Sequence, residues 1–126
     1  MAIQVYLWIN AILYLLFALW CLWRPTATAA YNGLSFMNGA GKAEYHAVYV
    51  GMEAGFAIFF AYCALNESMQ KAGILFAVCT YAGIVLMRIY SIARFGGATA
   101  SSYIIGGLEV VLGIIASILL FRYFPN

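Results

Sequence analysis

Four long runs of apolar residues dominate the chain, at about residues 2–23, 43–65, 72–94 and 102–124. Each run is close to the roughly 20 residues that an α-helix needs to cross the hydrocarbon core of a bilayer. In hydrocarbon, backbone N–H and C=O groups must be bonded within the protein, and a helix achieves this inside one segment. The pattern therefore predicts an all-α integral membrane protein with four transmembrane helices.

The connections between the runs predict how the helices are joined. Residues 66–71 and 95–101 are short links, which favours antiparallel neighbours among the last three helices. Residues 24–42 form a longer link with Pro25 and two turn-forming Asn-Gly pairs, and its apolar side chains predict partial burial in the membrane interface. Four crossings place both termini on the same side. We predict a single domain over residues 1–126, folded as a four-helix bundle.

Composition agrees with a lipid environment. Hydrophobic residues make up 67% of the chain and charged residues 8%, whereas soluble domains carry about 25% charged residues. The first run lacks a basic start and exceeds the roughly 7–15 apolar residues of a signal peptide, so we expect it to be retained. The net charge of +2 is small and scattered, which argues against nucleic acid as a partner. The expected partner is the lipid bilayer.

Three charged residues fall at membrane depth: Glu53, Arg88 and Glu109. A charge there costs about 2.5–3.5 kcal/mol or more, so each is expected to have a partner. Arg88 and Glu109 flank the last link at equal distances, which places them at one depth on neighbouring helices. An Arg88–Glu109 ion pair is the simplest prediction. Two interpretations stay open: the pair fastens two helices together, or it holds an anion or substrate.

The second apolar run has two different faces if it is a regular helix. At about 100° per residue, Glu53 lies on the face of His46 and Tyr49. Gly51 and Gly55 lie on the opposite face as a G-x-x-x-G motif, which suits close packing against another helix of the chain, a second copy in a homodimer or a partner membrane protein. Glu53, near the midplane, is the candidate for proton-coupled or acid–base chemistry.

These positions predict a polar cavity inside the membrane. Its candidate ligand-binding residues are His46, Tyr49, Glu53, Arg88 and Glu109, and Glu44 and Arg94 are placed at its rim. The chain lacks the H-x-x-x-H and E-x-x-H spacings of helical metal sites, so no metal is predicted. It also lacks phosphate-binding and dinucleotide-binding motifs, so no cofactor is predicted.

Two stretches resemble a family of small bacterial four-helix inner-membrane proteins of unknown function, loosely akin to DoxX-like proteins. They are Glu44-x-x-Ala47-x-Tyr49-x-Gly51, and Arg88-x-x-Ser91 followed by Gly96-Gly97 and Leu108-Glu109-Val110. The resemblance implies a multi-pass protein of the bacterial inner (plasma) membrane, with Glu44, Tyr49, Arg88 and Glu109 on the motif, and it implies no settled activity. The chain departs from the family at Phe95, where an Asp is common, and at His46, where a basic residue is more usual.

Three functions compete on these observations. The first is binding or transport of a small amphipathic or ionic ligand through the polar cavity. The second is an accessory or assembly subunit, in which the Arg88–Glu109 pair is structural and the glycine motif binds a partner helix. The third is a membrane enzyme that acts on a lipid-soluble substrate with Glu53 and His46 as acid–base groups, so the sequence leaves open whether the protein is an enzyme.

Overall fold

The computed structural model describes residues 1–125, and these are helical with short connections and no strand. The all-α prediction is confirmed. The helices group into two compact units, Met1–Glu67 (unit 1) and Ser68–Asn126 (unit 2, described to residue 125). That the two units form one domain stays a prediction.

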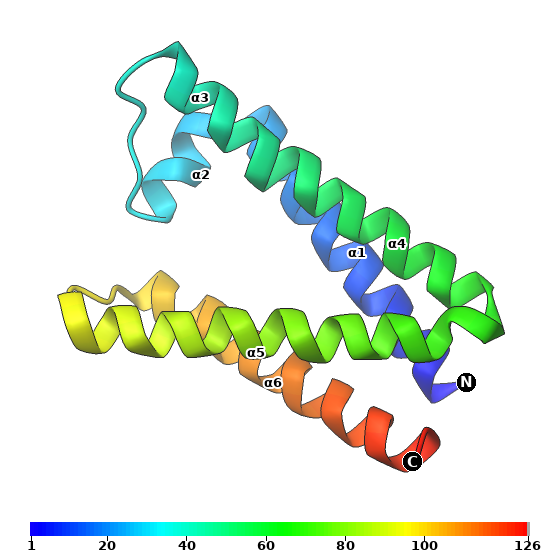
Figure 1. Cartoon of the computed structure of the whole chain (residues 1–126). Helices are drawn as coiled ribbons and strands as arrows, with labels where there is room; N and C mark the ends of the chain where they lie inside the picture. Colours follow the sequence, from blue (N-terminus) through cyan, green and yellow to red (C-terminus); the bar gives the residue numbers. More distant parts are fainter. Residues whose placement is uncertain (126) are drawn as a thin grey trace. The chain divides into compact units, whose positions relative to one another are not determined.

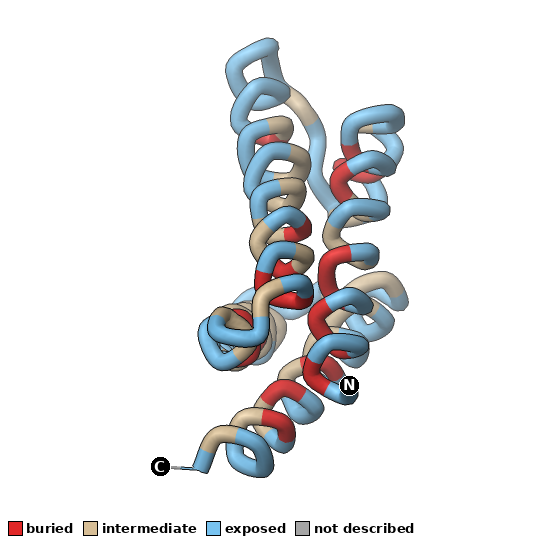
Figure 2. Tube along the Cα trace, turned by 90° about the vertical axis from the view of Figure 1, so that its right-hand side faces the viewer, coloured by how far each residue is buried: buried red, intermediate tan, exposed pale blue. Residues whose placement is uncertain are grey.

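Unit 1 is built from two long helices and a short one (Figure 1). Helix α1 (Ala2–Trp23) leads into α2 (Pro25–Tyr31). Helix α3 (Gly39–His46) continues through a π-helical segment, η1 (Ala47–Met52), into α4 (Glu53–Leu65). Buried residues follow the sides on which α1 and α4 face each other, and their outer sides are exposed (Figure 2).

Aromatic and polar contacts join α1 to α4. The rings of Tyr14 and Phe60 stack at a centroid distance of 5.6 Å. Near the start of α1, the Gln4 Nε2 group donates a 3.1 Å hydrogen bond to the Ala64 carbonyl. The Asn10 amide is fully buried and donates to the Tyr6 carbonyl within its own helix. A side-chain donor satisfied by a backbone carbonyl removes the cost of burying a polar group in an apolar setting.

The link predicted between residues 24 and 42 is more ordered than its sequence suggested. Pro25 occupies the first turn of α2, where a missing N–H costs nothing. The Asn38 side chain caps α3 by accepting a 3.0 Å hydrogen bond from the Gly41 N–H, so the helix begins at Gly39 and not near residue 43 as predicted. The predicted boundary was wrong because the Asn38 cap lies before the apolar run, so that small and polar residues form the first turn of the helix.

The π-helical segment η1 (Ala47–Met52) changes the geometry of the second span. A π-helix bonds i to i+5, so its residues do not follow the 100° spacing of an α-helix. Regular α-helical spacing, which predicts His46 and Glu53 on one face, therefore does not apply across this segment. Within α4 the predicted faces hold, since Glu53 is half-buried, Ala57 is buried and Gly55 is exposed.

Unit 2 is a helical hairpin. After the 3-10 turn η2 (Glu67–Met69), helix α5 runs over Gln70–Phe95 and helix α6 over Ala100–Tyr123. Gly96 and Gly97 lie between them with φ of 70° and 72°, a left-handed backbone that favours glycine. Thr99 caps α6 together with Ser102. Both helices start two residues earlier than predicted, α5 directly after the turn η2 and α6 directly after the Thr99 cap.

Candidate functional site

Arg88 on α5 and Glu109 on α6 form a bidentate pair. The Arg88 Nε donates to Glu109 Oε2 and the Nη2 donates to Oε1, each at 2.7 Å. The side chains are partly covered, with exposed fractions of 30% for Arg88 and 14% for Glu109. The fork of the guanidinium matches both carboxylate oxygens, which makes this among the stronger and more directional polar contacts available to side chains.

Two glycines on α6 let the hairpin helices approach at this site. A Cβ atom at Gly106 would lie 2.8 Å from the Arg88 Cδ, and one at Gly113 would lie 3.1 Å from the Tyr81 Cβ. Gly106 therefore leaves room for the Arg88 side chain to cross α6 and reach Glu109. Both glycines share the α6 face of Glu109 at α-helical spacing, so this face of α6 packs against α5.

Replacing Gly106 with alanine is expected to disturb the ion pair. Alanine raises helix propensity by about 1 kcal/mol, but its methyl group would displace an arginine that two hydrogen bonds hold in place. We expect Gly106→Ala to lower the free energy of unfolding by about 1–2 kcal/mol, measured by chemical unfolding in mixed micelles.

Two comparisons identify the cause of that loss. Gly107 has open space around its Cβ position, so Gly107→Ala is expected to be neutral or stabilising. In a background that already carries Arg88→Leu and Glu109→Leu, Gly106→Ala should also cease to destabilise. A loss of equal size in that background would show that the arginine stem is not what the methyl group disturbs.

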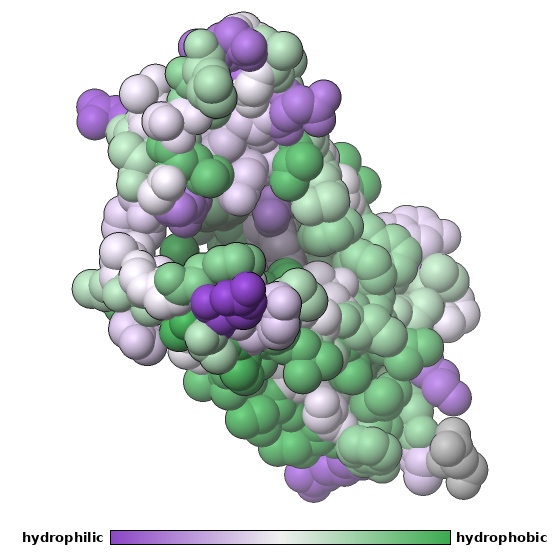
Figure 3. Space-filling model, turned by 60° about the vertical axis from the view of Figure 1, so that its left-hand side comes forward, coloured by the Kyte–Doolittle hydropathy of each residue, from purple (hydrophilic) through white to green (hydrophobic). Residues whose placement is uncertain are grey.

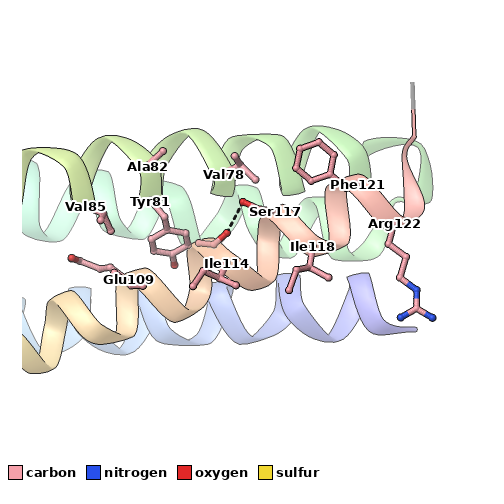
Figure 4. Close-up of a pocket in the computed structure, with 12 residues that line it drawn as sticks. Val78, Tyr81, Ala82, Val85, Glu109, Ile114, Ser117, Ile118, Phe121 and Arg122 are labelled. Atoms are coloured by element: carbon pink, nitrogen blue, oxygen red, sulfur yellow. Dashed lines mark hydrogen bonds between the residues drawn. The ribbon is translucent and has the colours of Figure 1, made fainter.

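A groove of about 660 Å³ runs along the α5–α6 hairpin from Glu109 to Arg122 (Figure 4). Its wall is mostly aliphatic and aromatic, and Ser117 is satisfied by donating a 2.9 Å hydrogen bond to the Gly113 carbonyl. We call it groove 1, and its lining residues are Val78, Tyr81, Ala82, Val85, Glu109, Val110, Gly113, Ile114, Ser117, Ile118, Phe121 and Arg122. Of these lining residues, only Glu109 was predicted from the sequence as a site residue.

A second groove, groove 2, continues from the ion pair toward the turn of the hairpin. It has a volume of about 510 Å³ and is lined by Arg88, Ile92, Ser102, Tyr103 and Gly106 among others. Val85 and Val110 line both grooves. Glu109 borders groove 1 and Arg88 borders groove 2, so the ion pair lies where the two grooves meet.

Two of the predicted site residues of unit 1, His46 and Tyr49, contact Tyr45. The rings of Tyr45 and Tyr49 stack at 4.6 Å, and the His46 ring meets Tyr45 edge-on at 6.1 Å. The His46 Nδ1 lies 2.7 Å from the Lys42 carbonyl oxygen, which can only accept, so Nδ1 carries the proton. Glu53 is half-buried at the start of α4, directly after the π-helical segment.

The predicted rim residues are both exposed. Glu44 lies on the outside of α3, and the Arg94 guanidinium lies 5.9 Å from the centroid of the Phe95 ring at the end of α5. The structure thus brings Arg88 and Glu109 together in unit 2, and His46 and Tyr49 around Tyr45 in unit 1. A cavity shared by all five residues would span both units, and it stays a prediction. Within residues 1–125, no group of three or more His, Cys, Asp or Glu side chains is placed to hold a metal ion.

The described helices define the class of protein. Among the described residues, four helical segments are long and apolar enough to cross a membrane: Ala2–Trp23, Gly39–Leu65, Glu67–Phe95 and Ala100–Tyr123. Large apolar side chains such as Ile58, Leu86 and Ile104 are more than 60% exposed, as expected for surfaces that face lipid. The chain is a multi-pass helical membrane protein.

Comparison with known families narrows the assignment. Residues 2–120 match the family described as Domain of unknown function (DUF4345), so the chain belongs to this family. The expectation of an uncharacterised family is confirmed, while kinship to DoxX-like proteins and a bacterial origin stay predictions. No curated protein and no solved structure matches the chain.

Proposed function

We propose that this protein binds a small amphipathic ligand on the α5–α6 hairpin. Its polar head would contact the Arg88–Glu109 pair and its apolar tail would lie in groove 1. The observation that carries the proposal is the position of the pair, a half-buried bidentate contact at the junction of two apolar grooves. Pockets for small ligands commonly combine an apolar lining with a few fixed polar groups in this way.

The exposure of the pair favours one head chemistry. The Arg88 side chain is 30% exposed and the Glu109 side chain 14%, so the guanidinium is the more accessible partner. A guanidinium only donates hydrogen bonds. The head would therefore be an acceptor, and an anionic carboxylate or phosphate would gain most from the positive charge.

The dimensions of groove 1 favour a single long hydrocarbon tail. Glu109 and Arg122 stand thirteen positions apart on α6, which corresponds to about 20 Å along the helix axis. Between them the groove presents chiefly Ile114, Ile118 and Phe121 from α6, with Val78 from α5. We place this activity in the inner membrane of a bacterium, in line with the family that the sequence resembles.

Native mass spectrometry of protein purified from membranes in a mild detergent tests the proposal. The wild type should retain a species of defined mass. The variant with both Arg88→Leu and Glu109→Leu should retain at least about tenfold less, because a hydrogen bond to a charged group contributes about 1.5–3 kcal/mol. Both leucines are used together so that neither charge is left alone.

Arg94→Leu is the matched control for this experiment. Arg94 is also an arginine of α5, but it is exposed and lines neither groove. It should retain the species like the wild type. Equal retention by the double-leucine variant, or no retained species on the wild type, would contradict ligand binding at the pair.

Transport of the same ligand is a second candidate, favoured by the continuity of the two grooves. Because Val85 and Val110 line both, an amphiphile could pass from the turn of the hairpin to the end of α6. The ion pair would act as a polar binding site between the two apolar grooves. Faster transfer of a short-chain fluorescent amphiphile between the leaflets of proteoliposomes, lost in the double-leucine variant, would separate transport from binding.

A further inference from the structure

The segment between the first two spans presents large apolar side chains outward. Trp23 is 80% exposed at the end of α1, and Met37 is 96% exposed before α3. Tyr31 and Leu34 are each more than 40% exposed between them. Tryptophan and tyrosine of this kind are enriched where a membrane protein passes through the headgroup layer.

Hydrogen bonds hold this segment in place on its inner side. The Tyr45 hydroxyl lies 2.7 Å from the Thr28 Oγ1, which itself donates to the Arg24 carbonyl at 2.9 Å. Cys21, Ala29 and Tyr45 form a buried cluster beneath α2. The short helix is therefore fixed against α1 and α3. Leu34 and Met37 lie in the connection between α2 and α3, which Phe36 holds by packing against Tyr45 at a ring centroid distance of 5.1 Å.

Positive charge borders the same surface. Arg24 follows Trp23, Lys42 lies in the first turns of α3, and both side chains are exposed. Neither forms an ion pair with another described residue. Residues 1–43 contain no acid, and Glu44 is the first one along the chain. Hydrophilic side chains gather at this end of unit 1 (Figure 3).

We infer that this surface, comprising Trp23, Arg24, Tyr31, Leu34, Met37 and Lys42, binds anionic lipid headgroups. The apolar side chains would enter the boundary between headgroups and acyl chains, and the two cations would contact lipid phosphates. Charge complementarity selects the occupant, since apolar residues alone would suit any lipid. This interaction lies in unit 1 and does not depend on the ligand proposed for the hairpin.

Trp23 itself can report the lipids around it. With Trp8→Phe and Trp20→Phe, Trp23 is the remaining tryptophan of the chain. The protein is reconstituted into phosphatidylcholine vesicles with phosphatidylglycerol, and either lipid is brominated in turn at equal mole fraction. Quenching by the brominated anionic lipid should exceed quenching by the brominated zwitterionic one by about two- to fivefold at low salt.

Charge variants and salt decide the interpretation. Arg24→Gln with Lys42→Gln should bring the quenching ratio to about one, while Lys71→Gln, an exposed cation outside this surface, should leave it unchanged. Raising the salt concentration to about 0.5 M should lower the quenching ratio of the protein that keeps Arg24 and Lys42. This test does not depend on the folding of a charge variant. A ratio of one at low salt, or a high ratio unaffected by the glutamines and by salt, would overturn the inference.

Discussion

Replacing Glu109 alone with leucine is expected to destabilise the protein by about 2–3 kcal/mol, because it leaves the Arg88 charge without its carboxylate in an apolar setting. This loss of stability should be smaller than that for breaking a fully buried ion pair, since the Arg88 side chain is 30% exposed. Arg88→Leu should act similarly. The variant with both leucines should lie within about 1 kcal/mol of the wild type, because neither charge then has to be desolvated.

Chemical unfolding of the four proteins in mixed micelles gives the coupling energy between the two side chains. Glu44→Leu is the control, since Glu44 is an exposed acid on α3, and its effect should stay within about 0.5 kcal/mol. If the losses of stability of the two single variants simply add in the double variant, the coupling energy is zero. The carboxylate and the guanidinium then do not stabilise each other.

The second large effect is expected where Gly113 of α6 faces Tyr81 of α5. A Cβ atom at Gly113 would lie 3.1 Å from the Tyr81 Cβ, an atom that cannot move without moving the α5 backbone. Gly113→Leu should therefore separate the helices and lower the free energy of unfolding by about 1–3 kcal/mol or more. The same measurement on Gly107→Leu should show no loss, because nothing lies within 4 Å of that Cβ position.

This pair of leucine variants separates packing from helix propensity. Both replace a glycine in the interior of α6 with a good helix former, so propensity alone predicts that both stabilise the protein. Opposite signs would establish that the hairpin depends on a glycine at residue 113. Stabilisation by both substitutions would mean that α5 and α6 do not approach as closely as 3.1 Å implies.

Much of the fold followed from the length of the apolar runs. A chain in hydrocarbon has few ways to satisfy its backbone, so about 20 apolar residues nearly determine a helix. The contact between Arg88 and Glu109 followed from counting residues to the turn, because a helical hairpin places residues equidistant from its turn at one depth. Gly106 and Gly113 lie on the face of Glu109 at α-helical spacing, and small residues of this kind let membrane helices pack closely.

Other features depended on local interactions that the apolar pattern does not record. The start of α3 is determined by the Asn38 cap, and α2 by Pro25 together with the hydrogen bond between Tyr45 and Thr28. The π-helical segment at Ala47–Met52 has no periodic signature, and it invalidates a face assignment made with regular α-helical spacing.

The sequence of α6 contains a pattern that indicates groove 1. Two neighbouring rows of α6 residues at i, i+4 spacing line the groove. The first row is Glu109, Gly113, Ser117 and Phe121. The second row is Val110, Ile114, Ile118 and Arg122. Each row begins or ends in a charged residue with small or apolar residues between. A charge at membrane depth predicts Glu109 but not Arg122, because Arg122 lies in the last turn of α6 and belongs to the groove only through the row of residues that it ends.

Photolabelling with a palmitate that carries a diazirine in its tail tests the proposed site most directly. Adducts mapped by peptide mass spectrometry should concentrate on Ile114, Ile118 and Phe121, and excess unlabelled palmitate and the double-leucine variant should both reduce them. Ile104 and Val111, which are exposed on α6 but line neither groove, report background labelling from the membrane. Labelling of groove 1 no stronger than at Ile104 and Val111, and insensitive to competitor, would contradict an amphiphile site on the α5–α6 hairpin.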